Sequence, residues 1–469
     1  MNNSIRNKLF IMMILEIAIW GAWLPLIFGY LPSLGFNPSE QAWILNAFAA
    51  GAIVAMFFSN QFADRKFAAE KFMAFSHLIG GVAMLALCFI KAPDMAALGF
   101  AEAPEKAVEA LAAAAANKDA GIGASPIFWP FFGLMLLHCL FYVPTLSIAN
   151  SIAFTHLKDA KKDFGFVRMG GTVGWILVAW PFIFILVDWA KIPAFSSTSL
   201  VNWLGAVFGT SKTGADFQAS VQSTFLVSGI ISLLLAGFSL TLPHTPPKPS
   251  EGRSFAWLEA FSLLKKPAIF VLFAVTFIDA FVHNLYFAWT GSFLGAAKDV
   301  GGVGIAGNWI MPVMTIGQVA ELATMAVLGA VLAKLGWRLT MIIGILGHAA
   351  RFAVYAFFAD NASMIVTIQI LHGICYAFFF ATLYIFIDEH LPKDIRTSAQ
   401  GLFNMLVFGF GPLASFYYGP KLLAEYTSPD KLVAWNKLFL IPCGAALVAM
   451  LLLALFFHPP KISSESTSS

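Results

Sequence analysis

Hydrophobic residues in this chain gather into long stretches that polar segments separate. Twelve stretches hold about 20 residues or more, the length that an α-helix needs to cross a bilayer. We expect the first six at 9–33, 41–63, 72–91, 126–152, 165–189 and 220–242. We expect the second six at 267–295, 307–333, 339–358, 363–388, 398–420 and 437–457. The pattern therefore predicts an all-α membrane protein with twelve transmembrane helices.

A polar segment separates the two sets of six. Residues 243–266 begin with a proline-rich run that cannot continue a helix, so we interpret the segment as a linker. Its second half, 255–264, has apolar residues at helical spacing, which indicates a helix along the membrane surface. The predicted domains are an N-terminal six-helix bundle at 1–242, the cytoplasmic linker, and a C-terminal six-helix bundle at 267–469 with a short disordered tail. Secondary transporters commonly consist of two related halves, with the substrate site near the membrane midplane between them.

Composition supports this class of protein and argues against others. The chain is 59% hydrophobic and only 11% charged, whereas soluble proteins carry about 25% charged residues. A net charge of +3 and the lack of a long basic run do not indicate nucleic-acid binding. No phosphate-binding glycine loop is present, so we expect neither ATP-driven transport nor a cofactor. All cysteines lie inside apolar spans and predict buried thiols rather than disulfides or metal ligands; they are Cys88, Cys139, Cys375 and Cys443.

The distribution of basic residues predicts the orientation. An even number of spans places both termini and the linker on one side of the membrane. That side carries most of the Lys and Arg residues of the short loops, so it is expected to be cytoplasmic. The long loops at 92–125 and 190–219 then lie outside. Each is either a lid or a tolerated insertion; the first contains an Ala-rich helix candidate, and we favour insertion for it.

The most informative polar residues lie in the span at 307–333. Gln318 and Glu321 are three residues apart, so their side chains share one helix face, and Thr315 and Thr324 extend the polar stripe. A carboxylate in mid-span costs about 2.5–3.5 kcal/mol on insertion scales, and such residues are functional candidates by default. A structural carboxylate bonded to a neighbouring helix is the alternative. A Gln amide donates and accepts hydrogen bonds and a carboxylate accepts from paired hydroxyls, so the pair suits a ligand that carries hydroxyl groups.

The span at 165–189 carries a second polar stripe. Arg168, Thr172 and Trp175 are spaced so that they share one helix face. The glycines of this span predict close approach by a neighbouring helix. Arg168 lies about one turn inside the cytoplasmic end. It therefore either faces the cavity or extends to the lipid head groups, while Thr172 and Trp175 favour the cavity.

The span at 267–295 also carries ionisable residues. Asp279, His283 and Tyr286 share one helix face, and Asn284 lies one step round it. A single His in a helix is more often structural. An unpaired buried carboxylate is expensive, so Asp279 is the stronger functional candidate.

Several segments resemble known transporters. The sequence ADR at 63–65 is similar to the loop signature of the major facilitator superfamily, although Asn60 replaces its usual glycine. Seven segments, in order along both halves, resemble the nucleoside:proton symporter family within that superfamily. They are 19–31, 62–81, 142–154, 168–175, 317–323, 371–388 and 395–403. The resemblance implies a major facilitator fold in a bacterial inner membrane, and secondary active import of nucleosides by proton symport through alternating access.

The resemblance also implies roles for individual residues. In the family, the matching Arg, Thr and aromatic residues meet the nucleoside, as does the Gln-x-x-Glu pair. The family's ligand-binding amide in the span at 267–295 corresponds to Asn284, with His283 as the alternative there. Phe378 belongs to an aromatic run that either lines the site or only packs. The substrate-binding candidates are Arg168, Thr172, Trp175, His283, Asn284, Gln318, Glu321 and Phe378.

The coupled proton is expected on a carboxyl group. Alternating access moves a group in the cavity between wet and occluded surroundings, which changes its protonation. We expect Glu321 to carry the proton, with Asp279 and Glu16 as rival carriers. The family commonly has an Asp where this chain has Ala377, which removes one further candidate.

Two other polar groups are interpreted differently. Asp64 and Arg65 lie in a tight turn between helices that must shift during alternating access, so we expect them to gate transport without touching substrate. The consecutive residues 388–390, Asp-Glu-His, resemble metal ligands in composition only. Because consecutive helix residues point in different directions, no metal site is predicted there.

The sequence therefore predicts a proton-coupled importer of nucleosides and not an enzyme. Its expected partners are nucleoside, protons and the lipid bilayer, and its expected oligomeric state is a monomer. Import of another small polar solute such as a sugar is the alternative, because clamps for hydroxyl groups look alike. A membrane-embedded enzyme or a sensor is less favoured. The sequence contains neither a catalytic cluster near a membrane face nor a soluble output domain.

Overall fold

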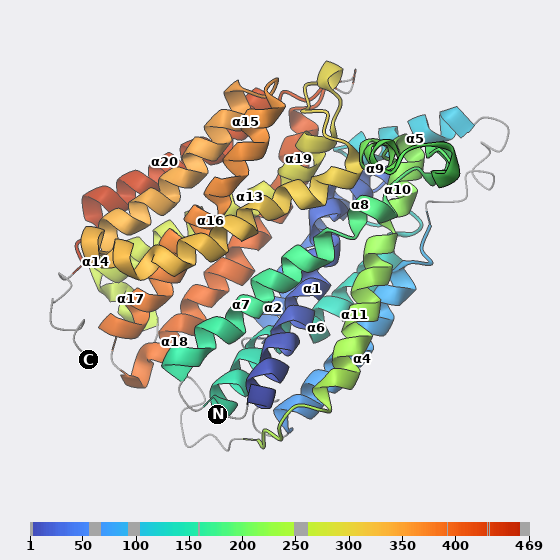
Figure 1. Cartoon of the computed structure of the whole chain (residues 1–469). Coiled ribbons are helices and arrows are strands. Elements are labelled where there is room, and N and C mark those ends of the chain that lie inside the picture. Colours follow the sequence, from blue (N-terminus) through green and yellow to red (C-terminus); the bar gives the residue numbers. More distant parts are fainter. Residues whose placement is uncertain are drawn as a thin grey trace. The chain divides into compact units, whose positions relative to one another are not determined.

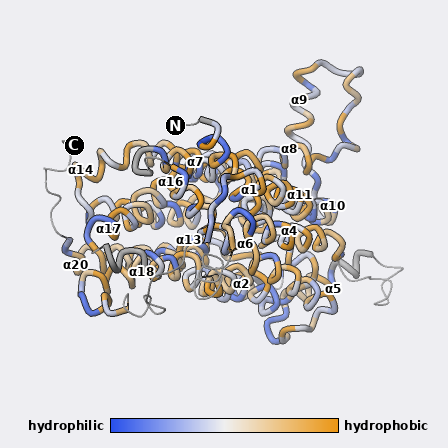
Figure 2. Tube along the Cα trace, turned by 90° about the horizontal axis from the view of Figure 1, so that it is seen from below, coloured by the Kyte–Doolittle hydropathy of each residue, from blue (hydrophilic) through white to orange (hydrophobic). Residues whose placement is uncertain are grey.

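A computed structural model describes residues 3–55, 67–91, 104–157, 160–247, 261–391, 393–428, 430 and 432–459. Within these residues the chain is helical, and its β-structure is limited to the isolated bridges Val187–Ser211 and Thr427–Val433 (Figure 1). Hydrophobic residues follow the long helices, while the short helix α9 projects away from the other helices of its part of the chain (Figure 2). The prediction of an all-α membrane protein is confirmed.

The helices of the first half are α1 Asn3–Ser33, α2 Pro38–Val54, α4 Ala69–Leu87, α5 Pro104–Ala116, α6 Phe128–His156, α7 Ala160–Ala179, α8 Phe182–Ile185, α9 Leu200–Gly209, α10 Gly214–Val221 and α11 Ser223–Ser239. Those of the second half are α13 Pro267–Gly295, α14 Ile310–Phe357, α15 Ala362–Thr367, α16 Leu371–Cys375, α17 Thr382–His390, α18 Lys393–Asn404, α19 Gly411–Glu425 and α20 Trp435–Phe456. π-Helical turns at Tyr376–Ala381 and Met405–Phe410 join α16 to α17 and α18 to α19. The Ala-rich helix candidate of the first long loop forms α5.

The twelve predicted spans all correspond to helices, although ten separate stretches in the described chain are long and apolar enough to cross a membrane. One of the ten, Gly307–Phe357, holds two predicted spans. They meet at Gly336, whose φ of 73° and ψ of 174° break the helix, and glycine adopts this positive φ without steric cost. The remaining predicted span is α2, of which 17 residues are described.

The chain divides into two compact units. Unit 1 contains Met1–Pro249, Phe287–Thr315 and Phe416–Val433. Unit 2 contains Ser250–Tyr286, Ile316–Ser415 and Ala434–Ser469. The domain boundaries at 242 and 267 stay a prediction. The surface helix predicted at 255–264 lies mostly outside the described residues.

In unit 1, small residues bring helices into close contact, as expected where van der Waals packing drives association. Helices α1 and α7 lie side by side (Figure 1). Gly174 of α7 faces the backbone carbonyl of Ile14 so closely that a Cβ atom would clash with it, and Gly170 meets the Phe10 carbonyl in the same way. The predicted close approach at the glycines of this span is therefore confirmed.

The contact of α7 with α1 leads to a prediction for Gly174→Ala. The added methyl group must push the two backbones apart, and overpacking of this kind costs about 1–3 kcal/mol. We expect a lower temperature of thermal unfolding for the purified protein in detergent.

Gly165→Ala is the matched control on the same helix, because nothing lies within 4 Å of the added atom. It removes a flexible residue, which stabilises a helix by about 0.4–1 kcal/mol. Equal unfolding temperatures for the two variants would contradict the close contact.

Candidate functional site

A buried arginine of unit 2 bonds two histidines. The side chain of Arg351, on the second half of α14, is fully buried. Its Nη1 lies 2.9 Å from Nδ1 of His372, and its Nη2 lies 3.0 Å from Nδ1 of His348. The guanidinium carbon lies 4.0 Å from the centre of the Tyr286 ring, a cation–π distance. One guanidinium thus joins side chains of α13, α14 and α16.

The donors of Arg351 determine how the two imidazoles are used. A guanidinium has only N–H donors, so His348 and His372 must each accept at Nδ1. In a neutral imidazole the hydrogen is then on Nε2. The Nε2 atom of His348 lies 3.7 Å from Oδ2 of Asp279. This distance is within ion-pair range but too long for a hydrogen bond.

Asp279 is the acidic member of this group. Its side chain is 0% exposed, and neither carboxyl oxygen has a hydrogen-bond partner within the described part of the chain. Burying an ionised carboxylate is costly unless an opposite charge or hydrogen bonds compensate it. Arg351 supplies the opposite charge in the same cluster. We call Asp279, His348, Arg351 and His372 the arginine cluster.

The neighbouring side chains of α13 complete its surroundings. The rings of His283 and His372 are stacked with centres 4.9 Å apart, and His283 meets His348 edge-on at 5.6 Å. Tyr286 donates to Oε1 of Gln369 at 3.0 Å. Asp279, His283 and Tyr286 therefore lie on one face of α13, as the sequence predicted. The described residues contain no group of three His, Cys, Asp or Glu arranged to hold a metal ion.

Gln318 and Glu321 lie on the first half of α14, next to α16. A Cβ atom on Gly317 would meet the side chain of His372, and one on Gly373 would meet the backbone of Glu321. These glycines therefore allow α14 and α16 to approach closely.

The side chains of Gln318 and Glu321 differ in how deeply they are buried. Gln318 is only 7% exposed, and its Oε1 atom has no hydrogen-bond partner among the residues described. Glu321 is half-buried. Thr315 and Thr324 donate to carbonyl groups of their own helix, so their hydroxyl hydrogens do not extend the polar stripe. An orphaned amide oxygen in a buried position is suited to accept a hydrogen bond from a ligand.

The other candidates of unit 2 have more local roles. Asn284 donates from Nδ2 to the Ala280 carbonyl of its own helix at 2.8 Å. Phe378 packs with Leu328 and Ala377 in an apolar cluster. Of the two alternatives on α13, the structure packs the ring of His283 against His348 and His372 and leaves the amide donor of Asn284 on its own helix.

The substrate-binding candidates of unit 1 lie on α7, where Trp175 packs against two other aromatic rings. Trp175 is buried against Trp20 in an edge-on arrangement at 5.7 Å, and the Phe287 ring lies 5.7 Å away. Arg168 and Thr172 are half-buried on the same helix. Both readings of Arg168 stay open. Asp64 and Arg65 lie outside the described residues.

Glu16 has a full set of partners inside unit 1. Its carboxylate lies 2.9 Å from Nε2 of His77 and accepts from the Thr145 hydroxyl at 2.7 Å. The Tyr142 hydroxyl donates to the Glu16 backbone carbonyl. These bonds join α1, α4 and α6, so they give this carboxylate a structural role in packing three helices.

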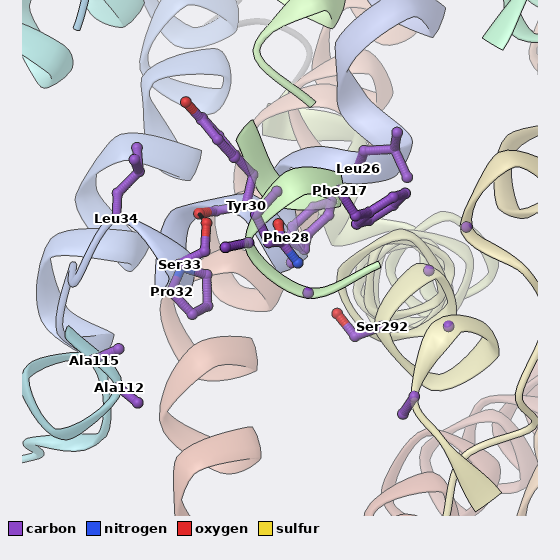
Figure 3. Close-up of a pocket in the computed structure, with 18 of the residues that line it drawn as sticks. Leu26, Phe28, Tyr30, Pro32, Ser33, Leu34, Ala112, Ala115, Phe217 and Ser292 are labelled. Atoms are coloured by element: carbon purple, nitrogen blue, oxygen red, sulfur yellow. Dashed lines mark hydrogen bonds between the residues drawn. The ribbon is translucent and has the colours of Figure 1, made fainter. Parts of the chain in front are cut away.

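Unit 1 also contains a partly open cavity that the sequence did not indicate. It has a volume of about 2040 Å³ and lies at the end of α1 away from the N-terminus. Ala112 and Ala115 of α5, Phe217 of α10 and Ser292 of α13 face it together with Phe28 (Figure 3). None of the predicted site residues lines it. The contributing segments are far apart in sequence and mostly apolar, so no local pattern distinguishes them from packing residues.

Comparison with known proteins supplies the class to which this arrangement belongs. A family model described as "Nucleoside H+ symporter" matches residues 1–99, 107–211 and 200–462. A putative nucleoside transporter of Escherichia coli K12, YegT, is 27% identical over 96% of this chain and 93% of its own length. The xanthosine permease of the same organism is 24% identical over 98% of this chain and 97% of its own. The crystal structure of the nucleoside transporter NupG covers 98% of this chain and all of its own, with a TM-score of 0.71 and 21% identity.

The arginine cluster leads to a prediction for His372→Leu. Leucine fills similar space but removes the ring nitrogen that accepts from Arg351. A buried donor left without an acceptor costs about 1–3 kcal/mol, and more when it is charged. We expect a clear fall in the thermal unfolding temperature of the detergent-solubilised protein.

His372→Asn is the matched variant, because its side-chain carbonyl can replace Nδ1 as the acceptor. It should lose much less stability than His372→Leu. If both variants unfold at the same temperature, the bond from Arg351 does not stabilise unit 2.

Proposed function

Because the chain belongs to the nucleoside H+ symporter family, we propose that it imports nucleosides together with protons by alternating access. The chain is a multi-pass membrane protein. The distribution of Lys and Arg supports an orientation with both termini in the cytoplasm of a bacterial cell. We propose that the protein acts as a monomer, with substrate moving through the inner membrane.

The observation that carries the site assignment is the unpaired amide oxygen of Gln318. It is buried on the same helix as Glu321, one turn away, and no described side chain uses it. Ribose hydroxyls both donate and accept, so Gln318 can accept one hydroxyl hydrogen while its amide donates to another oxygen. Glu321 can accept from a second hydroxyl. Together they form the proposed ribose clamp.

The remaining candidates are proposed to contact substrate or to control its passage. Trp175 offers an aromatic face for stacking against a base or a ribose, with Thr172 and Arg168 on its helix. His283, Asn284 and Phe378 are proposed contacts from unit 2. Asp64 and Arg65 are proposed as the gate on the cytoplasmic side, apart from substrate. Either Glu321 or its rival Asp279 is proposed to carry the proton.

A ligand-binding experiment tests the predicted substrate class. Uridine and adenosine should raise the thermal unfolding temperature of the purified protein, because a ligand that binds only the folded state stabilises it. The gain is about 2.7 kcal/mol at a concentration 100 times Kd. Ribose, glucose and free bases serve as comparison ligands in the same assay. A shift with sugars and none with any nucleoside would transfer the assignment to sugar transport.

A further prediction concerns the variant Gln318→Ala. The variant loses hydrogen bonds worth about 0.5–1.5 kcal/mol each, so nucleoside affinity measured by calorimetry should fall about tenfold. Val319→Ala is the control on the same helix, because Val319 is 52% exposed and does not face the clamp. Its affinity should be unchanged. Equal affinities for Gln318→Ala and the natural protein would place the substrate elsewhere.

A further inference from the structure

We propose that the arginine cluster is the proton-binding site of the transport cycle, with Asp279 as the group that gains and releases the proton. This inference rests on the proposed function and deepens it. Sequence reasoning favoured Glu321 as the carrier. The contacts of unit 2 separate the two carboxyl groups into different roles, with Glu321 in the ribose clamp and Asp279 in the proton site.

The charges of the cluster make it sensitive to one proton. Arg351 is permanently charged in proteins, and its side chain and that of Asp279 are both fully buried. With Asp279 ionised, and with neutral imidazoles, the cluster carries no net charge. With a proton on Asp279 it carries one positive charge. Because charge is costly inside a membrane protein, this change alters which arrangement of the surrounding helices is favoured.

The hydrogen bonds of the cluster select the acceptor among the titratable groups. His348 and His372 already use Nδ1 to accept from Arg351. A proton on either Nδ1 would break that bond and face the guanidinium about 3 Å away. Nε2 of His348 lies 3.7 Å from Oδ2 of Asp279, and the oxygens of Asp279 accept no hydrogen bond from the described residues. Asp279 is therefore the group in the cluster with open acceptor positions.

Titratable groups on α13, α14 and α16 contribute to the electrostatic balance around Asp279. His283 and Tyr286 lie along α13 itself, and His348 and Arg351 face it from α14. From α16 come His372 and the thiol of Cys375, which interacts electrostatically with Asp279. Among Asp279 and these six neighbours in unit 2, Arg351 is the only permanent cation and Asp279 is the only carboxyl group.

The cluster also reaches the proposed ribose clamp through α16. His372 bonds Arg351 through its ring and packs with its side chain against Gly317, beside Gln318. The next residue, Gly373, packs against the backbone of Glu321. A shift of α14 against α16 on nucleoside binding must therefore move His372 and with it Arg351. Coupling of this kind is reciprocal, so a proton on Asp279 changes nucleoside affinity by the factor by which nucleoside changes proton affinity.

The proton step is simple in chemical terms. An O–H bond forms on a carboxyl oxygen of Asp279 from water on one side of the membrane. The same bond breaks toward water on the other side after the helices have moved. The nucleoside itself undergoes no covalent change.

The test uses the full chain in liposomes with a trapped pH-sensitive dye. Two quantities are measured for each variant: proton movement caused by nucleoside, and nucleoside counterflow, which needs no proton gradient. For Asp279→Asn we expect counterflow to persist and nucleoside-driven proton movement to be lost. Glu16→Gln is the matched control, because its carboxylate is as deeply buried but is held by His77 and Thr145. It should keep both activities.

Each result decides between the alternatives. The proposal is overturned if nucleoside still moves protons in Asp279→Asn. It is also overturned if Glu321→Gln is the variant that loses nucleoside-driven proton movement while Asp279→Asn keeps it. If the natural protein transports no nucleoside at all, the proposed function fails first. If Asp279→Asn does not fold, His348→Asn replaces it. That variant keeps an acceptor for Arg351 but removes the Nε2 hydrogen facing Asp279, so the pH dependence of uptake should shift, and an unchanged profile contradicts the proposal.

Discussion

The buried guanidinium of Arg351 is the constraint on which the arrangement of unit 2 depends. A permanent charge inside an apolar helix bundle requires donors matched by acceptors and a compensating negative charge. Here the acceptors come from His348 and His372, and Asp279 supplies the negative charge when it is ionised. Because these residues belong to α13, α14 and α16, the requirement of one side chain specifies how three helices must meet.

Glycines make that meeting possible. Helix α16 contacts both halves of α14, through Gly317 and Gly373 on one side and through Gly347 against the Cys375 sulfur on the other. A larger residue at these positions would separate the backbones and lengthen the bonds to Arg351. In unit 1 the same principle applies to α1 and α7, where Gly174 meets the Ile14 carbonyl. In unit 2, the close contact between backbones thus brings the buried polar side chains within bonding distance of one another.

The three carboxyl groups considered for the proton illustrate how surroundings separate residues of identical chemistry. Glu16 is held by an imidazole and a hydroxyl group, so it connects helices. Glu321 is half-buried beside an amide with an unused oxygen. Asp279 is fully buried without a hydrogen bond among the described residues and faces a cation through one histidine. In the last arrangement, a proton on the carboxylate leaves the buried Arg351 without a compensating negative charge in the arginine cluster.

Local patterns in the sequence were sufficient to predict the membrane spans, because the length and hydrophobicity of a membrane helix are properties of consecutive residues. Helical spacing also placed Asp279, His283 and Tyr286 on one face, and the polar pair of α14 on another. The sequence did not indicate that Arg351, His348 and His372 belong to one group, since they come from helices whose contacts are decided by glycines far apart in the chain. Nor did it indicate that the ring of His283 packs against His348 and His372, because that contact depends on neighbouring helices. The sequence by itself therefore determined which residues are buried in helices, whereas the tertiary structure decided which buried polar groups meet, because hydrogen bonds and charge compensation depend on distances between helices that no local periodicity encodes.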